Sequence, residues 1–290
     1  MTSFAGQTQE PVETPRNPVR LSRLWLRLSL TAALLAGAGS VAGLAAPGVI
    51  YDQETVALAD SSTAQDIVNL FLVAPLMAGL AVWASRGSLR AYLCWFGFVA
   101  FTVYNYVIYT FSIHFGPLFL IWVAVLGLSL FALIGGLTTL DTASVKARFG
   151  ARSAPLQAWF LIAVAALFAL LWLSEIVPDL LVGDPSTSAS DMNVPTNPVH
   201  VLDLAFFLPA ALVSGVLVLR RHPLGYATVA GQLSWVALIC LPILVTPLVA
   251  NSRGHQPGWT VMVPVGFLFV LTLTVLVLLL RRQGPPGHGA

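Results

Sequence analysis

Eight long apolar stretches restrict the possible folds of this chain more than any other feature. Each has the length of about 20 residues that a helix needs to cross the hydrocarbon core of a bilayer. Only 9% of the 290 residues are charged, against about 25% in a soluble domain. Backbone in lipid must satisfy its own hydrogen bonds, so stretches without strand-like alternation form helices. We therefore predict an all-α integral membrane protein with eight transmembrane helices, at residues 22–46, 65–84, 89–112, 117–138, 155–175, 199–219, 225–249 and 259–280.

The basic residues indicate how these spans are oriented. All but one of the 14 lysine and arginine side chains lie in or next to the two tails and every second connection, some of them in the first turns of a span, and Arg253 is the exception. Loops rich in these residues stay in the cytoplasm, so we predict that both termini are cytoplasmic, as an even number of spans also requires. Residues 1–20 and 283–290 are predicted as disordered cytoplasmic tails that flank a transmembrane domain of residues 21–282. Span one is interpreted as a retained anchor, with a cleaved signal peptide as the alternative.

The two halves of the chain match weakly at an offset of 134 positions, without a gap from span two to the start of span three. Because both halves start inside, a duplication would give two parallel four-helix repeats, 21–138 and 155–282, related by an axis along the membrane normal. Chance similarity between apolar sequences is the alternative. The aligned pairs are Leu70 with Leu204, Pro75 with Pro209, Val82 with Val216, Arg86 with Arg220, Tyr92 with Tyr226 and Gly97 with Gly231, together with Asp66 opposite His200 and Asn69 opposite Asp203.

Polar and ionisable residues gather near the predicted outer ends of the spans. Residues three or four apart share a helical face, so His200 and Asp203 should point the same way. Charged groups inside a span are costly and tend to face a bundle interior or a water-filled cavity. We therefore expect an outward-facing cavity lined by Asp66, Asn69, Asn105, Tyr109, His114, Glu175, His200 and Asp203.

Three functions fit such a cavity. Intramembrane acids and histidines are typical of relays, which favours binding or transport of a proton, a cation or a small polar solute. A metal-dependent hydrolase or lipid-modifying enzyme of the outer leaflet is the second, with His114, His200 and Asp203 as candidate ligands of a divalent metal. The third is structural, with interhelical hydrogen bonds and no catalytic site. Whether the protein is an enzyme and what its oligomeric state is stay open; the lipid bilayer is the predicted partner, and nothing favours nucleic acid.

Several segments resemble a family of bacterial multi-pass membrane proteins whose activity is uncharacterised. The resemblance covers most of the span region, and it implies a bacterial cytoplasmic membrane without implying a substrate or mechanism. The segments are residues 65–66, 104–106, 114–120, 173–178 and 196–203.

Overall fold

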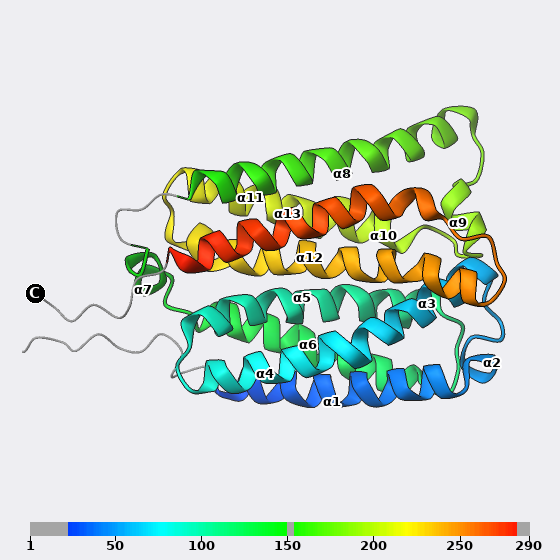
Figure 1. Ribbon diagram of the computed structural model, residues 1–290, viewed down its shortest axis with the longest axis horizontal. Coiled ribbons are helices and arrows are strands. Elements are labelled where there is room, and N and C mark those ends of the chain that lie inside the picture. The colour runs from blue at the N-terminus through cyan, green and yellow to red at the C-terminus, as the bar shows by residue number, and fades with distance from the viewer. Residues whose placement is uncertain (1–22, 150–153, 283–290) are drawn as a thin grey trace, which may run out of the picture.

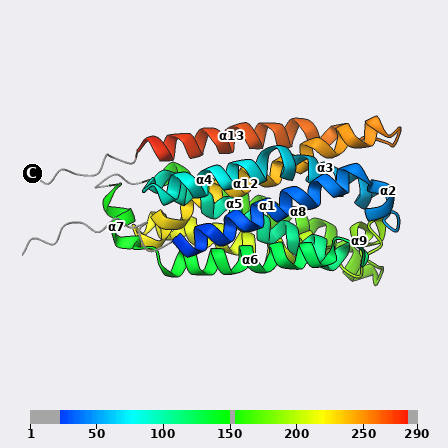
Figure 2. The same cartoon turned by 90° about the horizontal axis from the view of Figure 1, so that it is seen from below.

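The protein is a bundle of long, roughly parallel helices (Figure 1 and Figure 2). The computed structural model describes residues 23–149 and 154–282, and eight helices in these ranges are long and apolar enough to cross a membrane. No strand occurs in the same ranges. The prediction of eight helical spans is therefore confirmed. The two predicted tails, residues 1–20 and 283–290, lie outside the described residues.

Two of the eight spans contain a short π-helical segment, and three short helices lie in the connections. The spans are α1 (Arg23–Ala45), α3–η1–α4 (Val56–Val68, Asn69–Val73, Ala74–Ser85), α5 (Leu89–Ser112), α6 (Phe119–Thr138), α8 (Pro155–Val182), α10–η2–α11 (Pro198–Leu202, Asp203–Phe207, Leu208–Leu219), α12 (Pro223–Ser252) and η3–α13 (Trp259–Val261, Met262–Arg281). The short helices are α2 (Pro47–Ile50), α7 (Thr142–Ala147) and α9 (Thr187–Asp191).

Two spans are longer at one end than their apolar residues predict. Span two begins at Val56 rather than at residue 65, after Thr55, whose hydroxyl accepts a hydrogen bond from the Leu58 amide. Span five continues to Val182 rather than ending at residue 175, and it stops at Gly183, whose φ of 80° suits a helix terminus. The extension of span two is polar, whereas in span five Pro178 and Asp179 lie inside the helix, so neither low hydropathy nor a proline marked the helix ends.

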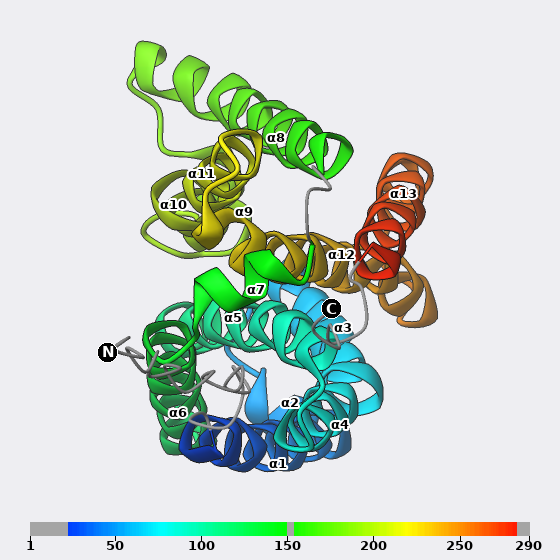
Figure 3. The same ribbon diagram turned by 90° about the vertical axis from the view of Figure 1, so that its left-hand side faces the viewer.

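The spans form two groups of four that meet along α5 and α12, the two most buried spans. Seen end-on, α1, α4, α5 and α6 close into a ring, in which α1 packs closely against α6 (Figure 3). In the second group, α8 packs on α11 and α13 packs on α12, but α8 makes few contacts with α13 (Figure 3). The first group is therefore closed and the second is open on one side.

The π-helical segments begin at Asn69 and Asp203, two residues that the offset of 134 aligns. In each, the residue after the segment donates its amide hydrogen bond to the carbonyl five positions back, from Ala74 to Asn69 and from Leu208 to Asp203. A proline follows directly in both spans. Proline lacks an amide hydrogen and crowds the carbonyl four residues before it, so a wider turn just ahead of it relieves the backbone. Such π-bulges are frequent at functional sites.

The α5–α12 contact contains another aligned pair. A Cβ added to Gly97 would overlap the carbonyl oxygen of Gly231, and a Cβ added to Gly231 would lie 3.4 Å from the amide nitrogen of Gly97. The absence of side chains at both positions lets the two backbones approach closely. Corresponding residues of the two groups thus meet at the crossing between them.

Candidate functional site

The candidate site lies at the end of the bundle that holds α2, α9 and the start of α3 (Figure 1). We call this the outer end, because the arginine distribution predicts that it faces away from the cytoplasm. The side chains expected to line one cavity there are distributed over several separate contacts.

Asp66 forms the most enclosed of these contacts. Its Oδ2 accepts a 2.6 Å hydrogen bond from the Tyr51 hydroxyl, and its Oδ1 accepts one of 3.1 Å from the Tyr109 hydroxyl, which also donates to the Ser62 carbonyl. Burial, and then the nearby charge of Asp66, raise the pKa of the Tyr51 phenol above its usual range, so this hydroxyl remains a donor. Gly43 of α1 packs directly on the carboxylate, where a Cβ would overlap Asp66 Oδ2.

The two predicted asparagines are buried near this level of the first group. Asn69 Oδ1 accepts a 2.9 Å hydrogen bond from Gln65 Nε2, one turn earlier on the same face, as their spacing predicts. The Nδ2 atoms of Asn69 and Asn105 have no hydrogen-bond partner in the part of the chain that the structure describes. Neither asparagine lines the central cavity described below.

Asp203, His200 and Glu175 come together in the second group around one tryptophan. The Trp172 indole nitrogen donates a 2.8 Å hydrogen bond to Asp203 Oδ2. The His200 ring packs against the Trp172 ring at a centroid distance of 4.8 Å, and His200 Nε2 lies 3.3 Å from Glu175 Oε2 without hydrogen-bond geometry. His200 and Asp203 therefore face the same neighbour, as predicted. Sequence spacing did not indicate Trp172 as the partner of Asp203, because the two residues lie 31 positions apart on different helices.

Two further carboxylates at the outer end were not anticipated. Asp60 Oδ1 lies 2.8 Å from Arg253 Nη1, and Asp60 Oδ2 lies 2.7 Å from His255 Nδ1. Glu54 accepts a 2.8 Å hydrogen bond from the His114 amide, and its Oε2 lies 3.1 Å from His114 Nδ1. Arg253 is the one basic residue on the predicted outer side. Because a lone cation beside a span needs an acidic partner, it could have indicated a carboxylate such as Asp60 nearby.

The three buried aspartates differ in how fully their carboxylates are paired. Both oxygens of Asp60 contact a cationic or histidine nitrogen, and both oxygens of Asp66 accept from a tyrosine. Asp203 is 5% exposed, and its Oδ2 is paired with Trp172. The Tyr104 hydroxyl also interacts with this carboxylate, but Oδ1 has no hydrogen-bond partner among the described residues. Asp203 is therefore the carboxylate with capacity for a further ligand.

Asp203 also lines a cavity of about 540 Å³ between the two groups of helices, which we call the central cavity. Of the eight predicted side chains only Tyr109 and Asp203 line it, so the expectation that all eight share one cavity is wrong for this cavity. Helical spacing predicted which residues share a face, but not how each helix is rotated in the bundle. Most of the lining is apolar or aromatic, including Phe101, Tyr104, Phe168, Trp172, Val236, Ile239 and Leu268.

The three candidate metal ligands lie in different contacts. His114 follows α5 and contacts Glu54, whereas His200 and Asp203 contact Trp172 on α8. Within residues 23–149 and 154–282, no three His, Cys, Asp or Glu side chains are grouped so that they could hold a metal ion. The predicted metal triad is therefore not formed.

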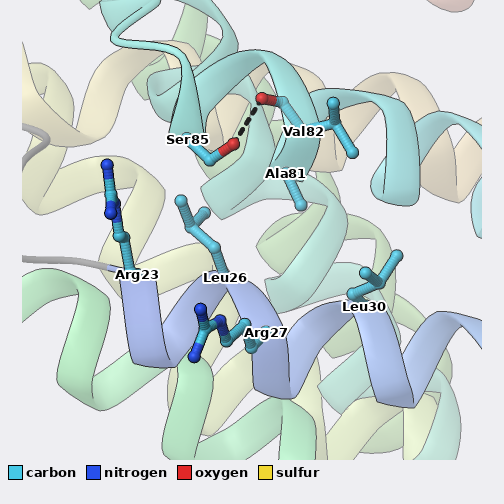
Figure 4. A pocket seen from close by; sticks show the side chains of 7 residues that line it. All are labelled: Arg23, Leu26, Arg27, Leu30, Ala81, Val82 and Ser85. Atoms are coloured by element: carbon cyan, nitrogen blue, oxygen red, sulfur yellow. Dashed lines mark hydrogen bonds between the residues drawn. The ribbon is translucent and has the colours of Figure 1, made fainter.

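A smaller cavity of about 280 Å³ lies at the opposite end of the bundle, between α1 and α4. Figure 4 shows Arg23, Leu26 and Arg27 of α1 opposite Ala81 and Ser85 of α4. The Ser85 hydroxyl donates within its own helix, to the Val82 carbonyl at 2.7 Å. This cavity carries the arginines expected near an inner membrane face, and it holds none of the predicted site residues.

The fold and the site define a multi-pass helical membrane protein with a half-paired, buried carboxylate beside an apolar cavity. Comparisons with protein-family models, with curated proteins and with solved structures each found no match. Function is therefore inferred from the residues of this chain.

Proposed function

We propose that this protein binds a cation in the central cavity, at Asp203, and exchanges it for a proton. The single observation that carries the proposal is the buried Asp203 carboxylate, which has one oxygen paired with Trp172 and the other without a hydrogen-bond partner in residues 23–149 and 154–282. A charged side chain costs about 2.5–3.5 kcal/mol at the centre of a span on insertion scales, and less toward a span end. Asp203 lies in the second turn of its span, and a cation or a proton bound at Oδ1 would remove the smaller cost of its charge there. Since both neutralise the same carboxylate, binding one displaces the other.

The neighbours of Asp203 support this role. The Trp172 indole orients the carboxylate through Oδ2, which leaves Oδ1 for a ligand. The His200 ring packs against the same Trp172 ring, and its Nε2 lies 3.3 Å from Glu175, whose side chain is 46% exposed. These two titratable groups offer a route for a proton between Asp203 and the outer solution.

We also propose that the protein consists of two parallel four-helix repeats and that both termini are in the cytoplasm. Support comes from the paired π-helices, from the Gly97–Gly231 crossing and from helix boundaries that differ by 134 positions, such as the starts of α5 at Leu89 and of α12 at Pro223. Two-fold related halves place a binding site near the interface between them. Resemblance to bacterial multi-pass proteins supports placement in a cytoplasmic membrane, which stays a prediction.

Neither of the other two functions has the same support. A hydrolase would need a nucleophile or an activated water, and no grouping of metal ligands in the described chain favours it. A structural role accounts for Asp60 and Asp66, whose oxygens are all paired. It does not account for Asp203, which is 5% exposed and has one carboxylate oxygen without a hydrogen-bond partner among the described residues.

Proton release measures the proposed exchange directly. Purified protein in weakly buffered detergent solution is titrated with sodium, potassium, tetramethylammonium and tetraphenylphosphonium, each as the chloride salt, while a pH-sensitive dye reports protons. We expect saturable release of about one proton per chain for at least one of these cations, because one carboxylate exchanges one charge. Asp203→Asn should abolish the release.

Asp191→Asn is the matched control, because Asp191 also lines the central cavity but is exposed at its rim. This variant should release protons as the wild type does. Release that survives in Asp203→Asn, or the absence of a saturable response to every cation in wild-type protein, would overturn the proposal. Reconstituted vesicles with an outward cation gradient then test whether bound cation is also transported.

A further inference from the structure

The opening between α8 and α13 distinguishes the second group of helices from the first. In the first group α1 packs against α6 and closes the ring. In the second, Gln157 Nε2 near the inner end of α8 donates to the Val275 carbonyl of α13 at 3.4 Å. Toward the outer end α8 rises away from α12 and α13 (Figure 1). There the central cavity is lined by Phe168 from α8 and by Val265 and Leu268 from α13. The cavity thus lies where the two helices have separated.

Several aromatic rings line or border the cavity that Asp203 lines. Tyr104 meets Phe207 edge-on at a centroid distance of 5.0 Å, and Phe207 stacks on Trp235 at 4.9 Å. Tyr104, Trp172 and Trp235 all line the cavity together with Asp203. Trp235 is 3% exposed, and its indole nitrogen has no hydrogen-bond partner among the described residues. A cation at Asp203 would therefore meet the faces or edges of tyrosine and tryptophan rings as well as a carboxylate.

The size and lining of the cavity decide between kinds of cation. A volume of about 540 Å³ far exceeds the roughly 30 Å³ that one water molecule occupies in the liquid, so a bare metal ion would leave most of it unfilled. A small metal ion also loses strongly bound water on entry, and an apolar lining cannot replace those contacts. A substituted ammonium or phosphonium ion is weakly hydrated, fills apolar space and is attracted to tryptophan and tyrosine rings.

We infer that the site takes a lipophilic organic cation, which enters from the outer leaflet through the opening between α8 and α13. This inference rests on the proposed function, because it names the substrate class and the access route of the same site. The cation's charge is placed at Asp203, its apolar groups contact Phe168 and Leu268, and Trp172 and Trp235 enclose the charged centre. A molecule partitioned into lipid reaches the opening along the exposed apolar surfaces of α8 and α13.

Two probes of equal charge test the substrate class. Protein in lipid nanodiscs is titrated with tetraphenylphosphonium and with tetramethylammonium, and binding is followed by tryptophan fluorescence. Tetraphenylphosphonium should bind at least about 100-fold more tightly, because only it buries aromatic surface in the cavity. Empty nanodiscs measure partition into lipid alone. Trp172→Leu should weaken its binding by about tenfold through the loss of a cation–π contact and of the hydrogen bond to Asp203.

Trp83→Leu is the control for the fluorescence measurement, because Trp83 is 59% exposed on α4 and lies outside the cavity. It should leave the affinity unchanged. Equal affinities for the two probes, or tighter binding of tetramethylammonium or sodium that still requires Asp203, would overturn the inference and leave the proposed function standing. If no probe binds in a way that Asp203→Asn abolishes, the proposed function itself is wrong.

A pair of substitutions on α13 tests the access route. Leu268→Trp narrows the opening, whereas Phe267→Trp adds bulk one residue away on a side chain that is 69% exposed and outside the cavity. In stopped-flow experiments, Leu268→Trp should slow the association of tetraphenylphosphonium by about tenfold or more, while Phe267→Trp should match the wild type. If both variants associate at the wild-type rate, the cation enters by another route, such as the outer recess beside Asp60 and His255.

Discussion

Replacing Gly97 by alanine should separate the two groups of helices at their closest point. The added Cβ would overlap the carbonyl oxygen of Gly231 and the Cβ of Ser234, and it would lie 3.0 Å from the amide nitrogen of Trp235. The overlapping atoms belong to the helix backbone or to the first carbon of a side chain, so a rotamer change cannot relieve the contact. The helices α5 and α12 must move apart, and Trp235 must move with them.

The expected magnitude follows from two opposing effects. Alanine is favoured over glycine inside a helix by about 1 kcal/mol. Overpacking of a close contact costs about 1–3 kcal/mol, and rigid backbone atoms place this site at the upper end. We therefore expect Gly97→Ala to lower the free energy of unfolding by about 2 kcal/mol. In Gly231→Ala the nearest atom is Phe96 Cβ at 3.1 Å, so the two effects should nearly cancel.

Thermal unfolding in one detergent compares these variants with Gly127→Ala, the matched control. A Cβ at Gly127, in the middle of α6, would meet no atom within 4 Å, so this variant should be as stable as the wild type or more stable. One kcal/mol corresponds to about 2–4 °C in chains of 150–250 residues, so Gly97→Ala should melt roughly 4–8 °C lower. The reasoning is refuted if Gly97→Ala melts with the control, since no tight crossing could then exist.

Three other substitutions test the contacts at the outer end by thermal unfolding. Arg253→Gln leaves Asp60, whose side chain is 4% exposed, without its arginine; a broken buried pair costs about 3–5 kcal/mol, and partial exposure of Arg253 reduces the expected loss to about 1–2 kcal/mol. An unchanged melting temperature would contradict this contact. Tyr51→Phe removes a donor to Asp66 and should cost about 1–3 kcal/mol. Because the folded-state pKa of Tyr51 is raised, its contribution is constant below the unfolded pKa of about 10. Wild-type stability should therefore fall as pH rises above that value, and an equal slope in Tyr51→Phe would contradict the assignment. His114→Ala removes a 42% exposed side chain from Glu54, whose own side chain is 1% exposed but keeps its hydrogen bond from the His114 amide, so it should cost about 1–2 kcal/mol; melting at the wild-type temperature would refute this contact.

Most of the fold follows from hydropathy, because lipid leaves a 20-residue apolar stretch few alternatives to a helix. The outer end of span two was the main exception. Residues 56–64 include Asp60, Ser61, Ser62 and Thr63, which lower the local hydropathy below that of a span. The structure pairs Asp60 with Arg253 and His255, residues more than 190 positions away. Local hydropathy contains no information about such a distant partner, so the predicted span two starts only at residue 65.

The sequence predicted which site residues share a helix face, but not which residues of different helices meet. Spacing along one helix placed His200 and Asp203 on a common face, and both contact Trp172. The level of a residue along the membrane normal also follows from its distance to a span end. The rotation of each helix about its own axis cannot be predicted in this way. These helices are apolar on every side, so their sequences do not indicate which face points into the bundle. That rotation directs Asp66 toward Tyr51 within the first group and Asp203 toward the central cavity.

Under the proposed duplication, the two groups have exchanged the position of their acid. The first carries Asp66 followed by Asn69, and the second carries His200 followed by Asp203 at the aligned positions. In the first, the acid lies one turn before the π-helix, where tyrosines pair both of its oxygens and α1 closes on α6. In the second, the acid is the first residue of the π-helix, where one oxygen has no partner among the described residues and α8 parts from α13. The position of the acid thus differs by one helical turn between a group with a fully paired carboxylate and a group whose carboxylate lines the central cavity. Under the proposed duplication, one copy keeps the paired arrangement and the other carries the proposed ligand site.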